Sequence, residues 1–168
     1  MRNFILILVI VTISQIAVAQ HINVNNTELL EETKFNNVSL GDIMRTKGNL
    51  SQMSLLFGNS IIEEQNETAP YLAKDLYNEN IYFGFEDDTE TGNDYYLAFI
   101  TVKNNSVVVK VKNLSIRIGD DKSKFGKMTM NPKSSSFNFL DADTGSASLS
   151  FEIDQTTNKV TEINFILY

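Results

Sequence analysis

The stretch Phe83-Gly84-Phe85-Glu86-Asp87 is followed later in the chain by a second copy of its pattern, Phe137-Asn138-Phe139-Leu140-Asp141. Leu97-Ala98-Phe99 likewise returns as Leu149-Ser150-Phe151, and a polar turn follows each time. Each turn leads into a further apolar segment, which carries Val108 and Val111 in the first copy and Val160 and Ile163 in the second. An internal repeat of this kind sets the architecture of the whole chain.

Within each copy the apolar residues alternate, as they do in a strand with one buried face. The acidic stretch Asp87–Asp94, which contains Gly92-Asn93, predicts a hairpin turn. The segment 95–102 is apolar on both faces, as expected of a covered central strand. The predicted strands are 81–86, 95–102 and 108–112 in the first copy, and 136–140, 148–154 and 159–168 in the second.

Short helical signals precede each set of strands. Leu40, Ile43 and Met44 have helical spacing and are followed by Gly48-Asn49, which predicts a helix end. A second short helix is expected after Ser51, with Gly58 as its end, and Asp120 is expected to cap a third that ends at Gly126. The remaining expectations are a charged loop over 63–69, one helical turn carrying Leu72 and Leu76, and a bulge or corner at Asn113, where the apolar phase changes.

These patterns predict an α+β fold of two tandem repeats. Each repeat is a short helical element followed by an antiparallel three-stranded β-meander, with the helices packed on one sheet face. The predicted organisation is a signal peptide at 1–19, a flexible N-terminal arm or loose first strand at 20–37, repeat one at 38–113 and repeat two at 114–168.

The N-terminus has the three parts of a secretory signal peptide. Arg2 is followed by an apolar run from Phe4 to Ile13, and small residues precede Gln20, which predicts cleavage after Ala19. The alternative, a buried core helix, is disfavoured by the crowded β-branched residues of that run. We therefore expect a periplasmic or secreted protein with no stable membrane anchor. The chain has no cysteine, which excludes disulfides, thiolate catalysis and a lipidated cysteine.

The chain is acidic, with 14 basic and 21 acidic side chains and a formal net charge of −7. Loss of Arg2 with the signal peptide leaves 13 basic side chains and a charge of about −8. This balance argues against nucleic-acid binding and suits a basic protein partner, another exported or periplasmic protein, by electrostatic steering. Asn-x-Ser/Thr sequons occur as well, at Asn25, Asn37, Asn49, Asn66, Asn104 and Asn113, so glycosylation stays open.

The residues give little support for catalysis. His21 is the only histidine and directly follows the predicted cleavage region, so we expect no histidine base, no metal site, no cofactor and no enzymatic activity. The acidic loops Asp87–Asp94 and Asp141–Asp143 are interpreted as hairpin turns, with weak calcium binding left open. A hydrolase that uses loop carboxylates is the third and last alternative for function.

The helix and hairpin motifs resemble those of a known fold. Leu40-Gly41-Asp42 with Phe57-Gly58, and Ile118-Gly119-Asp120 with Phe125-Gly126, each precede a meander, and together they cover about Val38 to Tyr168. This arrangement resembles the tandem repeats of the beta-lactamase inhibitor protein-like fold, and a single unit is similar to small outer-membrane assembly lipoproteins of the SmpA/OmlA type. The resemblance implies that helices cover one sheet face and that the opposite face can bind a partner.

We therefore expect an exported protein-binding module, of the inhibitor or immunity type, that acts by sheet-face contact. If Phe99 points into the core, the opposite face presents an apolar and tyrosine-rich patch. Its predicted partner-binding residues are Tyr82, Tyr96, Ile100, Val102 and Val108. The alternatives are that the arm or the segment 63–78 covers this face, or that the protein carries a small apolar or lipid ligand between helices and sheet.

Overall fold

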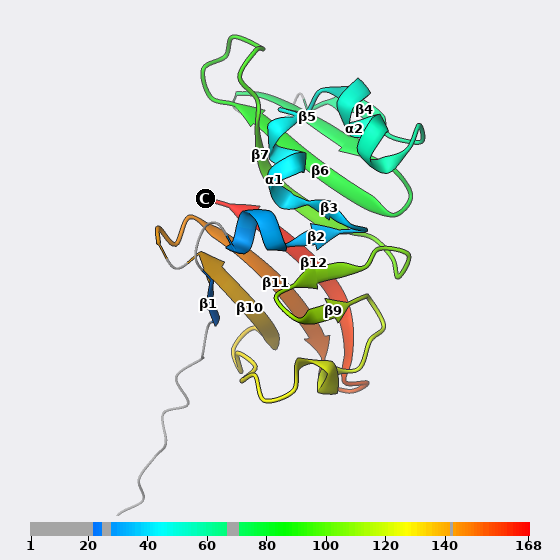
Figure 1. Ribbon diagram of the computed structural model, residues 1–168, viewed down its shortest axis with the longest axis vertical. Coiled ribbons are helices and arrows are strands. Elements are labelled where there is room, and N and C mark those ends of the chain that lie inside the picture. Colours follow the sequence, from blue (N-terminus) through cyan, green and yellow to red (C-terminus); the bar gives the residue numbers. More distant parts are fainter. Residues whose placement is uncertain (1–21, 25–27, 67–70, 142) are drawn as a thin grey trace, which may run out of the picture.

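The fold was obtained from a computed structural model, which describes residues 22–24, 28–66, 71–141 and 143–168 (Figure 1). The predicted signal peptide, its cleavage site and His21 lie outside the described residues. No helix within the described ranges is long and apolar enough to cross a membrane.

The described residues form mostly strands, with few helices. The strands are β1 (Ile22–Val24), β2 (Lys34–Phe35), β3 (Val38–Ser39), β4 (Ile62–Gln65), β5 (Leu72–Tyr77), β6 (Ile81–Asp87), β7 (Tyr96–Val102), β8 (Val109–Val111), β9 (Leu114–Ile116), β10 (Ser136–Asp141), β11 (Ala147–Asp154) and β12 (Lys159–Leu167). The helical elements are the π-helical turn η1 (Glu28–Glu32), the α-helices α1 (Leu40–Arg45) and α2 (Leu50–Phe57), and the 3₁₀ turn η2 (Lys122–Phe125). The α+β class with mainly antiparallel sheets is thus confirmed.

The described strands make two sheets. The large sheet has eight strands in the order β1-β10-β11-β12-β7-β6-β5-β4. It consists of two antiparallel meanders, β5-β6-β7 and β10-β11-β12, which are joined where β12 pairs antiparallel with β7. At one end of the sheet β1 pairs parallel with β10. The small sheet has the order β3-β2-β8-β9.

The small sheet and the helices lie on the same face of the large sheet, which we call the inner face (Figure 1). Phe57 at the end of α2 packs on Phe83 of β6, with ring centroids 4.9 Å apart. Phe125 at the end of η2 stacks on Phe137 of β10 at 4.0 Å and meets Phe151 edge-on. The core therefore fills the space between the large sheet and this covering layer, and the opposite, outer face of the large sheet lacks such a layer among the described elements.

The second meander and the first two helices lie where the sequence predicts them. Two other expectations are wrong. Residues 63–65, expected in a charged loop, lie in β4, and Leu72 and Leu76, expected on a helical turn, lie in β5. Residues four apart share one face of a strand as well as one side of a helix, so the spacing of Leu72 and Leu76 fits both structures.

The third strand of the first copy does not follow β7 in the large sheet. Residues 109–111 form β8, which pairs with β2 and β9 in the small sheet, and β12 takes the position beside β7. The phase change predicted at Asn113 is real. It is the two-residue turn of the β8–β9 hairpin, in which Lys112 has a φ of 51°.

For the segment 20–37, where the sequence predicts a flexible arm or a loose first strand, the described part forms short ordered elements. Leu29 of η1 and Phe35 of β2 are both fully buried in the core, and β1 extends the large sheet. The large apolar side chains of the segment 28–37 are Leu29, Leu30 and Phe35, and their spacing among polar neighbours shows no strand or helix period.

The helix starts also differ by one or two residues from the predicted caps. Asn49, rather than Ser51, caps α2 by accepting a hydrogen bond from the backbone N–H of Gln52. Asp121, rather than Asp120, caps η2 through the N–H of Ser123. Gly58 and Gly126 end these elements at positive φ, as expected.

A β-bulge decides which residues of β7 enter the core. Gly84 pairs with Phe99 and Phe85 with Leu97, so Ala98 is the extra residue that has no partner on β6. Beyond the bulge the phase reverses, because an extra residue exchanges the two faces of a strand. Ile100 and Val102 are therefore buried in the core, whereas Phe99 lies on the outer face, which corrects the predicted orientation of all three.

This orientation predicts unequal losses of stability for substitutions at two neighbouring positions. Ile100→Ala should lower the free energy of unfolding by about 2 to 5 kcal/mol, because it leaves a cavity in the core. Phe99→Ala should cost clearly less, since its ring is partly solvated. Urea denaturation of both variants tests this, and a larger cost for Phe99→Ala would contradict the bulge at Ala98.

Aspartates hold the two long hairpin loops in place. Asp87, at the end of β6, is buried and accepts hydrogen bonds from the N–H and hydroxyl of Thr89. Asp141, at the end of β10, accepts from the N–H of Asp143 and the hydroxyl of Thr144. The hydrogen bond from the Thr89 hydroxyl is the main cause that lowers the pKa of Asp87 to about 2. Both carboxylates thus act as fixed acceptors inside their own turns.

The lowered pKa of Asp87 predicts a pH dependence. A carboxylate with a depressed folded-state pKa stabilises the fold above its ordinary value of 3.8 and loses this effect as the pH falls toward 2. Asp87→Asn should therefore lower the urea midpoint at pH 7, and its difference from wild type should shrink between about pH 4 and pH 2. Asp88→Asn, at the exposed neighbouring position, is the control. A constant difference across this range would contradict the assignment.

Candidate functional site

The five predicted partner-binding residues do not form one surface. Tyr82 of β6 and Tyr96 of β7 are half-buried side chains of the outer face. Ile100 and Val102 lie in the core, as described above. Val108 lies beside the β2–β3 turn, where its backbone N–H donates to the side chain of Asn36 at 2.8 Å. The structure therefore keeps two of the five residues together on the outer face.

Those two tyrosines belong to a larger aromatic cluster. Tyr77 of β5 is directly opposite Tyr82, and their rings stack with centroids 5.7 Å apart and planes inclined by 16°. Tyr82 stacks in turn on Phe99 of β7, again at 5.7 Å, with planes inclined by 15°. We call Tyr71, Tyr77, Tyr82, Tyr96 and Phe99 the outer aromatic patch. Because the rings of Tyr77, Tyr82 and Phe99 stack on one another, these three side chains offer a partner mainly ring edges and the two phenol hydroxyls.

A glycine makes room for this stack. The Phe99 ring lies over Gly84, and a Cβ at position 84 would be 2.2 Å from the Cε1 atom of that ring. A glycine weakens a strand unless a neighbouring group covers it. Here the aromatic ring covers the glycine and is itself brought beside Tyr82. Gly84 is therefore a positioning residue of the patch.

Carboxylates pair with the phenols of the patch. The Tyr77 hydroxyl donates to Glu64 of β4 at 3.1 Å, and the Tyr96 hydroxyl donates to Glu86 of β6 at 3.2 Å. Burial, followed by the charge of Glu86, raises the pKa of Tyr96 to about 12. Burial and a hydrogen bond to Asp75 raise the pKa of Tyr82 as well. The phenols therefore stay protonated at neutral pH, and those of Tyr77 and Tyr96 donate hydrogen bonds to the carboxylates beside them.

One cation lies at the end of the stack. The Nζ atom of Lys103 is 4.8 Å from the ring centroid of Tyr77 and 5.2 Å from that of Tyr82. It also lines a surface hollow of about 380 Å³ together with Ile62 and Glu79. A lysine ammonium is attracted by the electron-rich faces of aromatic rings. The patch thus already binds a cation supplied by its own chain.

The second meander continues the outer face with polar residues. Glu152 of β11 is directly opposite Glu162 of β12, and both are exposed. Ser150 and Asn164 form the next pair, and Asn164 accepts a hydrogen bond from Thr101 of β7 at 2.9 Å. Like charges opposite each other destabilise a sheet, so the Glu152–Glu162 pair does not serve folding. The outer face therefore combines an aromatic half with an acidic, polar half.

Sequence reasoning missed several residues of this site. The sequence analysis assigns no role to Tyr77, expects Phe99 in the core, and does not connect the carboxylates Glu64, Asp75 and Glu86 with the tyrosines. The pairing of strands brings them together, and pairing is not visible in one sequence. The alternation of Tyr71, Ala73, Asp75 and Tyr77 with Leu72, Lys74 and Leu76 was the available signal for β5.

Comparison with known proteins gives little further information. No family model matches the chain, and no curated protein matches it. Among solved structures it is similar to a cysteine-rich secretory protein from Staphylococcus aureus, with 15% sequence identity and a TM-score of 0.35. The match covers 70% of this chain and 43% of that protein, so it spans less than half the length of the staphylococcal protein. A similarity of this size carries no argument about function.

The described residues contain no group of three or more acidic, histidine or cysteine side chains that could hold a metal ion. At Asp87 and Asp141, the acidic loops direct carboxylate oxygens toward their own backbone and threonine groups. The outer aromatic patch, with the carboxylates beside it, is the candidate site.

The contact between Gly84 and Phe99 predicts a coupled effect on stability. Gly84→Ala should destabilise the fold by about 1 to 3 kcal/mol, because the new methyl group displaces the Phe99 ring. In a Phe99→Ala background the same change should cost much less, which gives a coupling energy of about 1 kcal/mol or more. Urea titrations of the two single variants and the double variant measure this. Strictly additive costs would contradict the described position of the ring.

Proposed function

We propose that the protein is an exported protein-binding module whose partner seats on the outer aromatic patch. The observation that carries this proposal is the pairing of stacked aromatic rings with carboxylates on an uncovered sheet face. Tyrosine is enriched at the energetic centres of protein interfaces, because it offers a large rigid contact and a hydrogen-bonding group together. The exposed Ile62 and Ile166, at the margins of the patch, add apolar contact area.

The charges favour a basic partner. Glu64, Asp75 and Glu86 lie among the tyrosines, and Glu152 and Glu162 extend the acidic area along the same face. A Lys or Arg side chain of a partner could contact both a tyrosine ring, as Lys103 does at the end of the stack, and a neighbouring carboxylate. The overall negative charge of the chain would accelerate the encounter. The module would act by occupying such a surface, in the manner of an inhibitor or an immunity protein.

The architecture supports an origin by duplication. The corresponding strands β6 and β10 each end with an aspartate, Asp87 or Asp141, that accepts a hydrogen bond from a nearby threonine. A short helical element ending in Phe-Gly packs a ring on each meander. We infer that these are two copies of one unit, related to the beta-lactamase inhibitor protein-like and SmpA/OmlA-like folds. Export, with removal of residues 1–19, is part of the same proposal and rests on the signal-peptide pattern.

A matched pair of exposed aliphatic residues tests the binding surface. Ile62 lies beside Tyr77 on the outer face and is 55% exposed, whereas Leu55 lies on α2, on the other side of the sheet, and is 86% exposed. Ile62→Asp should abolish capture of the partner from the native envelope fraction, and Leu55→Asp should leave it intact. Neither change should move the melting temperature by much, since both side chains are solvated.

The charge of the partner is tested in the same assay. Glu86→Gln should weaken capture, and raising NaCl from about 0.05 M to about 0.5 M should weaken it further for wild type. The captured protein should have a basic surface. Loss of capture with Leu55→Asp but not with Ile62→Asp would place the interface on the inner side and overturn the proposal.

A further inference from the structure

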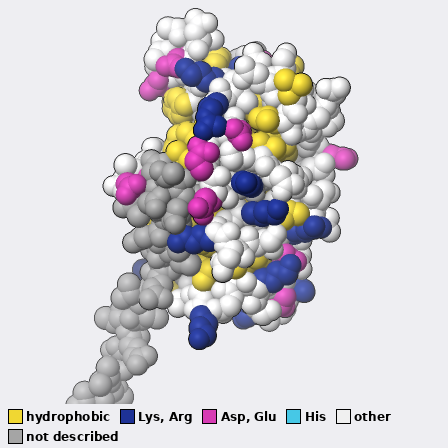
Figure 2. Space-filling view, viewed as in Figure 1, with side chains coloured by type: hydrophobic (Ala, Val, Ile, Leu, Met, Phe, Trp, Pro, Cys, Tyr) yellow, Lys and Arg dark blue, Asp and Glu magenta, His cyan; other side chains and the backbone are white. Residues whose placement is uncertain are grey.

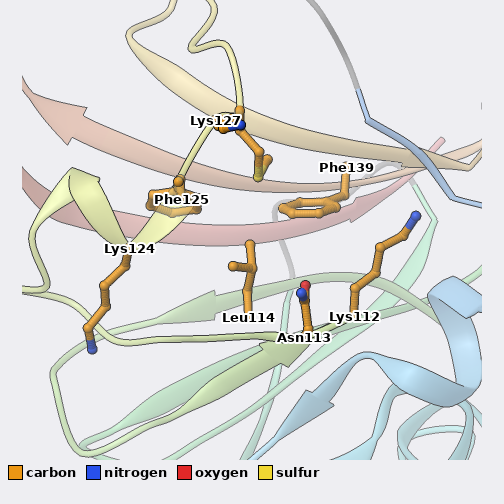
Figure 3. Close-up of a pocket in the computed structure, with 9 residues that line it drawn as sticks. Lys112, Asn113, Leu114, Lys124, Phe125, Lys127 and Phe139 are labelled. Atoms are coloured by element: carbon orange, nitrogen blue, oxygen red, sulfur yellow. The ribbon is translucent and has the colours of Figure 1, made fainter.

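A surface hollow of about 300 Å³ opens where the small sheet and the large sheet diverge (Figure 3). Its walls come from the β8–β9 hairpin, from the segment that follows η2, and from β10. This region is separate from the outer aromatic patch, because it lies on the inner side of the large sheet. A volume of 300 Å³ is at the lower end of the range for small-molecule sites.

The base of the hollow is apolar. Phe125 and Phe139 are almost completely buried, and their rings lie next to each other in the close-up (Figure 3). Leu114 points from β9 toward these two rings, and Met128 is a further apolar part of the lining. Both Leu114 and Met128 remain half-buried, so they have apolar surface left to cover. A hydrocarbon segment of a ligand would fit against this apolar base.

The rim of the hollow is cationic. Three of its nine lining residues are Lys112, Lys124 and Lys127, and none of the described lining residues is acidic, in a chain with a net charge of −7. Lys124 forms an ion pair with Asp120 at 2.8 Å and points away from the rings. Lys127 lies on the other side of the rings from Leu114 in this view (Figure 3).

The surroundings add to this positive potential. Lys and Arg side chains gather over the small sheet on the face shown in Figure 2. On that sheet Lys34 lies directly opposite Lys110. Like charges that are direct neighbours raise the local attraction for an anion. The basic area therefore faces away from the acidic outer face.

A second basic hollow differs from the first in the polarity of its lining. Its basic residues are Arg45, Lys47 and Lys74. Arg45 pairs with Asp42 and Glu31, Lys47 pairs with Asp94, and Lys74 lies over the ring of Tyr95. Its lining is mainly polar and has no apolar floor. The hollow beside Phe125 and Phe139 is the one that combines an apolar floor with a cationic rim.

We propose that this hollow binds a small amphipathic anion, a carboxylate with a short to medium hydrocarbon chain. The chain lies along the rings of Phe125 and Phe139 beside Met128, and the carboxylate lies at the rim, where Lys127 is its main cationic contact. This site is independent of the outer aromatic patch, so each can fail without the other.

Isothermal titration of the mature protein with octanoate, octanol and octylammonium tests the proposal. Octanoate should bind at least about tenfold more tightly than octanol, and octylammonium should bind least, because the rim favours a negative headgroup. From hexanoate upward, each added methylene should tighten binding about threefold to fourfold until the hollow is full. Equal affinity for octanoate and octanol, or no binding at millimolar concentration, would overturn the proposal.

Variants locate the site. Lys127→Gln should weaken octanoate binding about tenfold and leave octanol binding unchanged, whereas the control Lys110→Gln, outside the hollow, should leave both unchanged. Ligand-induced NMR shifts should concentrate at Met128 and Leu114. Equal losses with Lys127→Gln and Lys110→Gln would indicate a diffuse charge effect and contradict the site. Binding to phosphatidylglycerol vesicles without binding of free octanoate would show a lipid-surface contact and overturn the proposal as well.

Discussion

The pairing of β12 with β7 holds the two halves of this protein in one sheet. Four residue pairs, from Ile163–Val102 to Ile166–Phe99, carry the contact between the halves. Their inward members, Ile163, Val102, Phe165 and Ile100, are all buried, so the same contact also joins the two parts of the core. Because β12 occupies the edge of β7, β8 pairs elsewhere and builds the small sheet. One strand contact thus decides both the large sheet and the layer that covers it.

Different groups of charged side chains lie on the two faces of the large sheet, and each face carries both signs. The covering layer on the inner face presents lysines over the small sheet (Figure 2), while the outer face carries Glu64, Asp75 and Glu86 among the tyrosines. Neither face could be recognised from the net charge alone, because the sum hides the distribution. The two proposed sites follow this division: a basic protein for the outer face, and a small anion for the hollow on the inner side.

The parts of the fold that the sequence predicted are those with a long regular pattern. The second meander and β6 alternate over several residues, and α1 and α2 have clear end signals in Gly48 and Gly58. The small sheet was not predicted, because strands of two or three residues, such as Lys34–Phe35, are too short to show a period. The partner of β7 was also unpredictable, since β12 is remote in the sequence.

The candidate site was predicted in part for the same reason. Tyr82 and Tyr96 were assigned to the outer face correctly, because both lie in regular pairs with their neighbours. The bulge at Ala98 reversed the phase in the middle of β7, so Ile100 was placed outside and Phe99 inside. A bulge needs no special residue type, and alanine gives no sign of it. The wrong phase beyond the bulge therefore placed the aliphatic Ile100 on the outer face, where the structure has the aromatic Phe99.

The central position of β12 has a consequence for the order of folding. Until β12 is available, β7 has a bare edge of unpaired backbone groups beside apolar side chains, and such edges promote association between chains. Before β12 is synthesised, the first meander therefore lacks the strand that covers this edge of β7. Closure of the sheet depends on contacts between distant segments, and folds of this kind form slowly. A nascent chain of this protein would benefit from being kept unfolded until its last strand has been synthesised.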